Sequence, residues 1–298
     1  MILTDEKRFF HIPVMYKEVI DYLNLSPGKI IIDATVGTGG HAFYILKKIL
    51  PGGKLIGIDK DKEVLEICAK RLEEFQRNFE LIYGDFRNID ELIKDLNLPH
   101  IDGILFDLGV SSYQLQNPER GFSFQHNGPL DMRMDRNTFI SAYDLVNNLN
   151  EDEISNLLWT FGQERWHNRI ARYLVEERKK KHISTTLELA ELVKKAVPYK
   201  YSRIHPATRT FQALRIAVNR ELEALEEAIF KAVGLLNRKA RFVVISFHSL
   251  EDRIVKHSFR KLSSDLKIIT KKPLRPTSLE IKENPSCRSA KMRVAERS

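Results

Sequence analysis

Apolar residues in the first 110 positions alternate between short continuous runs and helical spacing. Four short runs are expected to form buried strands, at residues 29–32, 54–58, 80–83 and 101–105. Apolar residues recur at helical spacing in four further segments, from Pro13 onward and at residues 42–49, 62–75 and 91–96. This alternation predicts an α/β fold with a parallel sheet and crossover helices.

The pattern changes in the middle of the chain. Residues 111–135 are rich in Gly, Pro, Asn and Ser and predict a long loop, which in a compact domain is commonly functional. Three helix-like segments then follow without an intervening strand, at residues 151–161, 164–181 and 185–197. The last opens with Thr185 and Glu188 at capping-box spacing.

The α/β pattern resumes near the C-terminus. A long amphipathic helix is expected at residues 211–236, and strands are expected at 241–245 and 266–270. We therefore predict one discontinuous α/β domain, formed by residues 1–112 and 209–298. An all-helical domain inserted at residues 113–208 interrupts it.

Composition narrows the class of protein. The chain has 298 residues, of which 43% are hydrophobic and 30% charged, which is enough to bury a core. No apolar run is long enough to cross a membrane, and Asp5 and Glu6 lie where a signal peptide would carry positive charge. Cys68 and Cys287 have no CxxC partner, which argues against a disulfide scaffold and a zinc site. We expect a cytoplasmic protein without a metal.

The net charge of +8 is unevenly distributed. Residues 165–215 and residues 253–298 each hold 13 Lys and Arg against 4 Asp and Glu, so each segment carries +9. The rest of the chain is acidic. Two basic segments beside an acidic body suit a polyanion-binding protein, although solvated helix faces and a basic tail would give the same pattern.

A glycine-rich turn follows the first predicted strand. Residues 33–41 read Asp-Ala-Thr-Val-Gly-Thr-Gly-Gly-His, and Gly37, Gly39 and Ala42 fit the G-x-G-x-x-A spacing of dinucleotide sites. Asp59 closes the second strand 20 residues after Gly39, where a carboxylate can accept both hydroxyls of a ribose. Together they predict an adenosine-containing ligand, and they leave open whether it is a nicotinamide cofactor or S-adenosylmethionine.

Acidic residues also follow the third and fourth strands. Asp85 could bind an adenine amino group and Phe86 could stack on the ring, or the two could be a turn residue and a core residue. Asp107 lies at the carboxyl end of a central strand, where ligands bind in open α/β sheets. Asp61 is expected to be the N-cap of the next helix.

Seven motifs, in order along the chain, resemble one family. They are His-Ile-Pro-Val-Met at 11–15, the glycine turn at 33–41, Gly-Ile-Asp-Lys-Asp at 57–61, Asp-Gly-Ile-Leu-Phe-Asp-Leu-Gly-Val-Ser-Ser at 102–112, Arg-Gly-Phe-Ser-Phe at 120–124, Gly-Pro-Leu-Asp-Met-Arg-Met-Asp at 128–135 and Ser-Phe-His-Ser-Leu-Glu-Asp-Arg at 246–253. The chain closely resembles the bacterial ribosomal small subunit methyltransferase H family. That family methylates the exocyclic N4 of a cytidine in the decoding region of 16S ribosomal RNA.

The resemblance implies a Rossmann-like, S-adenosylmethionine-dependent methyltransferase domain with a helical insertion. The residues at the family's cofactor positions are Gly39, Gly40, His41, Asp59, Phe86, Asp107 and Gln114. It also implies 16S ribosomal RNA, in the small subunit or free, as the partner. Whether the chain forms a homodimer is left open.

The expected chemistry is methyl transfer to a cytosine amino group. Such a nitrogen is a poor nucleophile, so its N–H must meet an acceptor, and Asp107 is the candidate unless it is committed to the cofactor. Methylation at cytosine C5 would need a thiolate, and neither Cys68 nor Cys287 lies in a suitable loop motif. A nicotinamide-dependent dehydrogenase and a non-catalytic RNA-binding module are the other classes considered.

Contacts to the target nucleotide are predicted at Arg133 and His248. The alternatives are an ion pair of Arg133 with Asp131 or Asp135, and a hydrogen-bonded histidine at the edge of the core. Further basic residues are expected to contact phosphates, namely residues 178–181, Arg203, His205 and Arg209.

Overall fold

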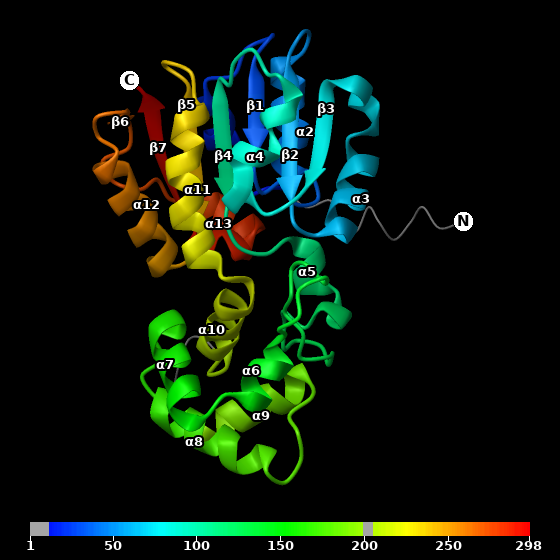
Figure 1. Cartoon of the computed structure of the whole chain (residues 1–298), viewed down its shortest axis with the longest axis vertical. Helices are drawn as coiled ribbons and strands as arrows, with labels where there is room; N and C mark the ends of the chain where they lie inside the picture. Colours follow the sequence, from blue (N-terminus) through cyan, green and yellow to red (C-terminus); the bar gives the residue numbers. More distant parts are fainter. Residues whose placement is uncertain (1–11, 199–204) are drawn as a thin grey trace. The chain divides into compact units, whose positions relative to one another are not determined.

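The computed structural model describes residues 12–198 and 205–298, and the chain divides into two compact units (Figure 1). The first unit combines the chain up to Ser111 with Leu222–Ser298, and the second is Ser112–Glu221. His11 and Arg203, which the sequence analysis singled out, lie outside the described residues.

The first unit is built on a seven-stranded sheet with the order β3-β2-β1-β4-β5-β7-β6. The strands are β1 (Ile30–Asp33), β2 (Lys54–Asp59), β3 (Phe79–Tyr83), β4 (Gly103–Asp107), β5 (Arg241–Ser246), β6 (Leu266–Ile268) and β7 (Lys291–Arg297). Strands β1 to β5 are mutually parallel, whereas β7 is antiparallel to both β5 and β6. The strand order reverses between β1 and β4, where doubly wound sheets bind ligands. The predicted α/β class is confirmed.

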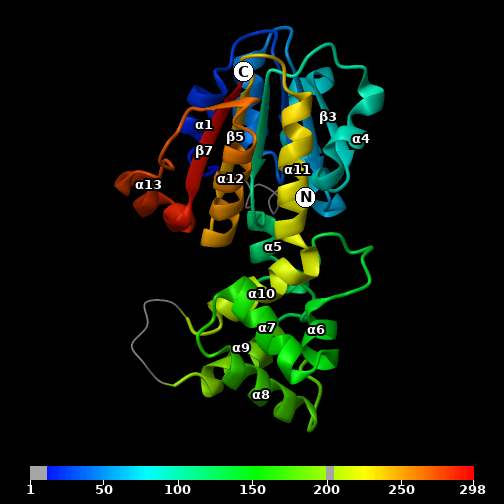
Figure 2. The ribbon, with the colours of Figure 1, turned by 60° about the vertical axis from the view of Figure 1, so that its left-hand side comes forward.

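Helices cover both faces of this sheet, as Figure 2 shows from a second direction. One face packs with α1 (Tyr16–Leu23), α2 (Gly40–Ile49) and α3 (Lys62–Arg71) into one core cluster. The other packs with α4 (Ile89–Leu92), α11 (Glu221–Leu235) and α12 (Ser249–Lys261). A short helix, α13 (Ser278–Glu283), precedes β7. Burial on both faces explains why β1 and β4 have continuous apolar sequences.

Strand β7 was not predicted from the sequence. It pairs with β5 from Arg241↔Glu296 to Ser246↔Lys291, which leaves only its last residue, Arg297, unpaired with β5. Its sequence, Lys-Met-Arg-Val-Ala-Glu-Arg, mixes charged with apolar positions and therefore resembles a solvated tail. Two of its positive charges are compensated within the same unit, because Lys291 and Arg293 both contact the carboxylate of Asp252 on α12. Part of the basic C-terminal segment is thus a strand inside the sheet.

The second unit is helical. Its helices are α5 (Ser112–Gln116), α6 (Ala142–Asn148), α7 (Glu151–Gly162), α8 (His167–Arg178), α9 (Thr186–Ala196) and α10 (Thr208–Asn219). The predicted capping box is present at α9, where Thr185 accepts a hydrogen bond from the backbone N–H of Glu188 and the Glu188 side chain accepts one from that of Thr185. Helices α6 and α7 open with capping boxes of their own, which fix their starting points.

The single helix expected at residues 211–236 is two helices, and that expectation was wrong. Arg220 has a left-handed backbone (φ 50°) and separates α10 from α11. Residue 219, just before the break, is a buried asparagine whose side chain bonds the loop at residues 132–134. Helix α10 therefore lies within the helical unit, beyond the predicted end of the insert at residue 208.

None of the helices in the described part of the chain is long and apolar enough to cross a membrane.

Candidate active site

Three neighbouring parallel strands of the first unit each end in an aspartate. Asp33 ends β1, Asp59 ends β2 and Asp107 ends β4. Because β1 lies between β2 and β4 with all three strands parallel, these carboxylates share one edge of the sheet. The following glycine turn and the start of α2 lie at the same edge. The sheet therefore gathers the residues that the sequence predicted to hold an adenosine-containing ligand.

Asp59 connects the second strand to the glycine turn. Its Oδ2 atom accepts a hydrogen bond from the backbone N–H of Gly37 at 3.0 Å, and its Oδ1 atom accepts one from the backbone N–H of Asp61 at 3.0 Å. Desolvation by burial raises the pKa of Asp59 to about 6. Asp61 is the N-cap of α3, as predicted, accepting from the N–H groups of Glu63 and Val64.

Asp107 contacts two neighbouring residues, one through its backbone and one through its carboxylate. Its backbone N–H donates to the hydroxyl of Thr35 at 2.6 Å, which ties the end of β4 to the turn after β1. Its Oδ2 atom lies 3.4 Å from Nε2 of His41, a residue of the first turn of α2 with only 5% of its side chain exposed. The geometry thus brings together two residues that the family resemblance had singled out.

Asp33 is a member of this cluster that the sequence analysis did not select. It is 1% exposed, and its Oδ1 atom accepts a hydrogen bond from the backbone N–H of Thr35 at 3.3 Å. Desolvation by burial raises its pKa to about 7; His41 opposes that shift and the nearby Asp107 adds to it. The signal that could have identified Asp33 was its position, since it ends its strand just as Asp59 and Asp107 end theirs.

The glycine at position 39 is required by backbone geometry and by close packing. Gly39 is the N-cap of α2 with φ 79°, a left-handed value that strains other residues. A Cβ atom placed there would lie 3.0 Å from Sγ of Cys68. At Gly40 a Cβ atom would lie 3.2 Å from Pro13. The chain can therefore enter α2 this closely only with small residues at both positions.

The residues after β3 have local roles in the structure. Asp85 accepts a hydrogen bond from the backbone N–H of Arg87 at 2.9 Å, and its Oδ2 atom lies 3.5 Å from Nζ of Lys60. The ring of Phe86 is half-buried and packs 5.3 Å from that of Phe106. These contacts match the turn and core alternatives, and a cofactor contact by Phe86 stays a prediction.

The Oδ1 atom of Asp107 is an orphaned buried polar atom. It has less than 1 Å² of exposed surface and no hydrogen-bond partner within the described part of the chain. A buried carboxylate oxygen in this situation suits a positively charged or N–H-bearing ligand group. The residues at this edge therefore fit a ligand that carries an ammonium group as well as an adenosine.

Gln114 belongs to the second unit. It is 4% exposed and lies in α5. Its contact with the cofactor stays a prediction.

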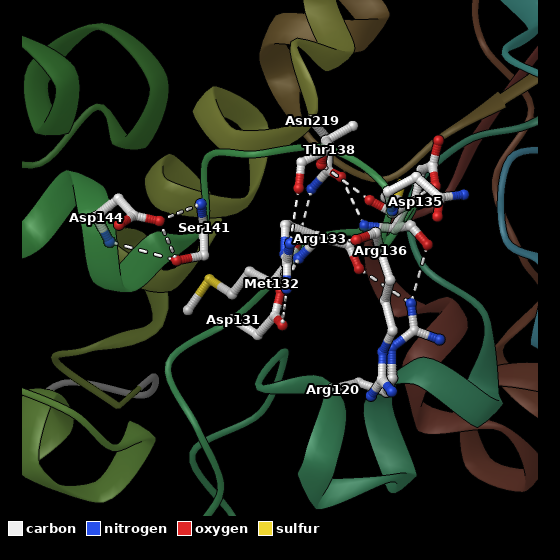
Figure 3. Close-up of polar contacts among 12 residues, drawn as sticks. Arg120, Asp131, Met132, Arg133, Asp135, Arg136, Thr138, Ser141, Asp144 and Asn219 are labelled. Atoms are coloured by element: carbon white, nitrogen blue, oxygen red, sulfur yellow. Dashed lines mark hydrogen bonds and ion pairs between the residues drawn. The ribbon is translucent and has the colours of Figure 1, made fainter.

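The loop between α5 and α6 is held by polar contacts inside the second unit (Figure 3). Arg120 is 1% exposed and donates to the backbone carbonyls of Arg133 and Met134, both at 2.9 Å. Asn219 of α10 accepts from the N–H of Met134 and donates to the carbonyl of Met132, both at 2.8 Å. Side chains of Arg120 and Asn219 thus hold the backbone of the loop that was expected to be functional.

The guanidinium group of Arg133 is occupied by partners in the same loop. Figure 3 shows its bidentate pair with Asp131, in which Nε and Nη2 each donate to a carboxylate oxygen at 2.8 Å. Its Nη1 atom donates to the carbonyls of Arg136 and Thr138. The Asp131 pair holds the pKa of Arg133 above its usual value. The alternative of an internal ion pair is what the structure contains, and a nucleotide contact by Arg133 stays a prediction.

His248 caps α12 at the carboxyl end of β5. Its Nδ1 atom accepts from the backbone N–H of Glu251 at 3.4 Å, and its Nε2 atom lies 3.1 Å from Oε1 of Glu251. Both side chains are nearly buried, with 9% and 2% exposed. His248 therefore has a structural role, and its contact with the target nucleotide stays a prediction.

Most of the predicted phosphate contacts in the helical unit already have protein partners. Arg178 donates to the carbonyl of Val146, Lys180 pairs with Glu177, and Lys181 pairs with Glu188. The imidazole of His205 stacks on Phe124, and Arg209 donates to the carbonyl of Gln163. The run at 178–181 therefore offers less unpaired positive charge than its sequence suggests.

Both cysteines are free and buried. Cys68 packs in the core behind the glycine turn, and desolvation raises its pKa above the ordinary value, as it does for Cys287. Neither thiol can readily become the thiolate that covalent catalysis needs.

Comparisons with a family model and with individual relatives agree on the family of this chain. The model of the MraW methylase family matches residues 8–298. The ribosomal RNA small subunit methyltransferase H of Thermotoga neapolitana is 51% identical over 292 residues, covering 96% of both chains. The proteins of the same description from Persephonella marina and Brevibacillus brevis are 49% and 44% identical, over 96% and 97% of this chain and 99% and 98% of theirs. The chain therefore belongs to the MraW methylase family, as one of the ribosomal RNA small subunit methyltransferases H.

Proposed function

We propose that the chain transfers a methyl group from S-adenosylmethionine to the exocyclic N4 of a cytidine in the decoding region of 16S ribosomal RNA. Membership in the family supports ribosomal RNA as the substrate. The N4 atom and the position in the RNA rest on the resemblance of the sequence motifs. The observation that carries the proposal is the Asp107 carboxylate, whose Oδ1 atom is buried without a partner among the described residues. Asp107 lies at the carboxyl end of β4, next to β1, where the strand order of the sheet reverses.

The cofactor site consists of residues at this edge. Gly39 and Gly40 allow close approach to the start of α2, Asp59 receives the ribose hydroxyls and Phe86 flanks the adenine. His41 and Asp107 would receive the methionyl end, and Gln114 is a further cofactor position that the family resemblance implies. When bound, S-adenosylmethionine supplies an electrophilic methyl group whose bonding electrons remain on sulfur as it leaves.

The protein contributes alignment and a proton acceptor. Methyl transfer to N4 forms a C–N bond, and one of the two amino protons must leave. In this proposal Asp107 accepts a hydrogen bond from that amino group, and the nearby Asp33, whose pKa is raised to about 7, can hold the proton that leaves. A fixed geometry can lower the barrier by several kcal/mol, because the reactants no longer have to find one another.

Two thiols that are buried and have raised pKa values argue against the competing reaction at cytosine C5. That reaction requires a thiolate to add to the C6 atom of the base. The carboxylates at the sheet edge suit an amino group instead, because they can accept its N–H.

Substrate recognition is assigned to the helical unit and to basic residues of the α/β unit. Arg133 and His248 are the candidate contacts to the target nucleotide. The small ribosomal subunit is the proposed assembly, and a homodimer is a further proposal.

Calorimetry and methyl transfer together test the proposal. The chain should bind S-adenosylhomocysteine and should not bind NAD. It should then transfer labelled methyl groups from S-adenosylmethionine to small subunits or naked 16S RNA. Binding of NAD alone would favour a dehydrogenase, and binding of neither ligand would favour a non-catalytic RNA-binding module.

A further inference from the structure

A basic groove lies on the first unit, between α12 and the segment that follows β6. It has a volume of about 310 Å³ and is lined by four cationic side chains and no acidic one, namely Lys256, Arg260, Lys271 and Arg293. Helix α12 packs directly on this part of the sheet, since Phe259 and Leu266 belong to one core cluster (Figure 1). The walls of the groove are therefore fixed by the core.

Three of these cations are unpaired. Within the described part of the chain, the side chains of Lys256, Arg260 and Lys271 have no hydrogen-bond or ion-pair partner. Arg260 and Lys271 are exposed and Lys256 is half-buried. This contrasts with the run at 178–181, where Arg178, Lys180 and Lys181 have partners within the protein.

The base of the groove is also positively charged. Arg293 is 8% exposed, and its Nε atom lies 2.6 Å from Oδ1 of Asp252. Nζ of Lys291 contacts the other oxygen of the same carboxylate at 3.1 Å. The single carboxylate of Asp252, which is partly exposed, thus faces two cations and does not neutralise the three cations at the rim that lack a described partner.

The groove lies beside the sheet from the level of Ile104 to that of Phe106, because Ile268 and Arg293 align with these β4 residues through the strand pairing. Strand β7 is antiparallel to both β5 and β6, so β6 runs parallel to β5 and the chain leaves it toward the carboxyl ends of the parallel strands. Lys271 lies just beyond that end of β6. Three strand spacings separate β6 from β4, which corresponds to roughly 14 Å across the sheet.

We propose that this groove binds the phosphodiester backbone of the RNA substrate beside the target nucleotide. The inference rests on the proposed function, because it takes RNA as the polyanion. Cations on separate, flexible side chains suit a backbone that passes along them, whereas a small anion would need a tighter cage of buried donors. Phe259 and Ile268 add apolar surface to the groove, which suits contact with the sugar groups between successive phosphates.

The test compares two triple variants of equal charge. The groove variant combines Lys256→Gln, Arg260→Gln and Lys271→Gln. The control combines Lys48→Gln, Arg77→Gln and Lys94→Gln, which are exposed cations without described partners on other surfaces of the same unit. Binding of labelled 16S RNA is measured at several salt concentrations, and calorimetry with S-adenosylhomocysteine checks that each variant is folded.

The groove variant should bind RNA about tenfold or more weakly near 0.1 M salt, and its plot of log affinity against log salt should lose about two to three units of slope. The control should keep the slope of the unmodified protein. Equal slopes for both triple variants would overturn the proposal that the groove binds RNA, even if the unmodified protein transfers methyl groups normally. Weakened binding to assembled subunits but not to naked RNA would also overturn it, by indicating a protein partner. Absence of methyl transfer to RNA by the unmodified protein would instead contradict the proposed function.

Discussion

The Nε2 atom of His41 lies 3.4 Å from the Oδ2 atom of Asp107, although the two residues come from different elements of the α/β unit. His41 is on the first turn of α2, and Asp107 ends β4. The contact closes one side of the carboxylate and leaves Oδ1 without a described partner. The backbone N–H of Asp107 is tied to Thr35, which positions the carboxylate beside His41 at the end of β4.

Replacing Asp107 by asparagine should impair both cofactor binding and turnover. The variant Asp107→Asn keeps the shape of the side chain but removes its charge, and a hydrogen bond to a charged group contributes about 1.5–3 kcal/mol. We expect the affinity for S-adenosylhomocysteine to fall by about tenfold or more, as measured by calorimetry. Asp95→Asn, at an exposed position, is the matched control. Wild-type turnover and affinity in Asp107→Asn would exclude a role for this carboxylate.

Asp33 should make stability depend on pH in a predictable direction. Its pKa is raised to about 7 in the folded protein, so between pH 4 and pH 7 the folded chain keeps a proton that the unfolded chain has released. The free energy of unfolding therefore loses this contribution as the pH rises through that range. Asp33→Asn removes the effect.

The measurement is urea unfolding of the ligand-free protein and of Asp33→Asn at several pH values. The stability of the variant relative to the unmodified chain should increase from pH 4 to pH 7, by at most about 4 kcal/mol. The difference should then stay constant at higher pH. Parallel stability curves across this range would show that the carboxyl group titrates normally.

Asn219 should be a major support of the loop at residues 132–134. Asn219→Ala removes two buried hydrogen bonds and leaves the N–H of Met134 and the carbonyl of Met132 without that partner. We expect a loss of about 2–4 kcal/mol in the free energy of unfolding. The exposed Asn156→Ala on α7 is the control and should cost far less. Equal effects of the two changes would contradict the assigned role of Asn219.

The two cysteines should be dispensable for chemistry. A variant with Cys68→Ala and Cys287→Ala loses buried volume, so some destabilisation of about 1–2 kcal/mol is expected. Methyl transfer to RNA, assayed with labelled cofactor, should persist. Complete loss of transfer in a variant that still binds S-adenosylhomocysteine would point to a covalent mechanism instead.

The alternation of strands and helices could be predicted from the sequence because β1, β2 and β4 are buried on both faces and carry short apolar runs before their terminal aspartates. Strand β7 was not readable in this way, since the charges of Lys291 and Arg293 are compensated by Asp252, a residue distant in sequence. The break at Arg220 was equally hidden, because nothing in the local periodicity interrupts the helix between α10 and α11.

The candidate site could be predicted only in part from the sequence. Glycine spacing and strand-end acids identified Gly39, Asp59 and Asp107, and their shared edge is present in the fold. The contact of His41 with Asp107 and the burial of Asp33 depend on how α2 packs over the strand ends. Local sequence patterns do not contain that information.

The central claim is that the chain methylates a cytidine at N4. It is tested most directly by digesting 16S RNA to nucleosides after reaction with isotopically labelled S-adenosylmethionine, and identifying the labelled nucleoside by chromatography and mass spectrometry. The account predicts label in N4-methylcytidine from a single position of the decoding region. Label in 5-methylcytidine, or in a nucleoside other than cytidine, would contradict it.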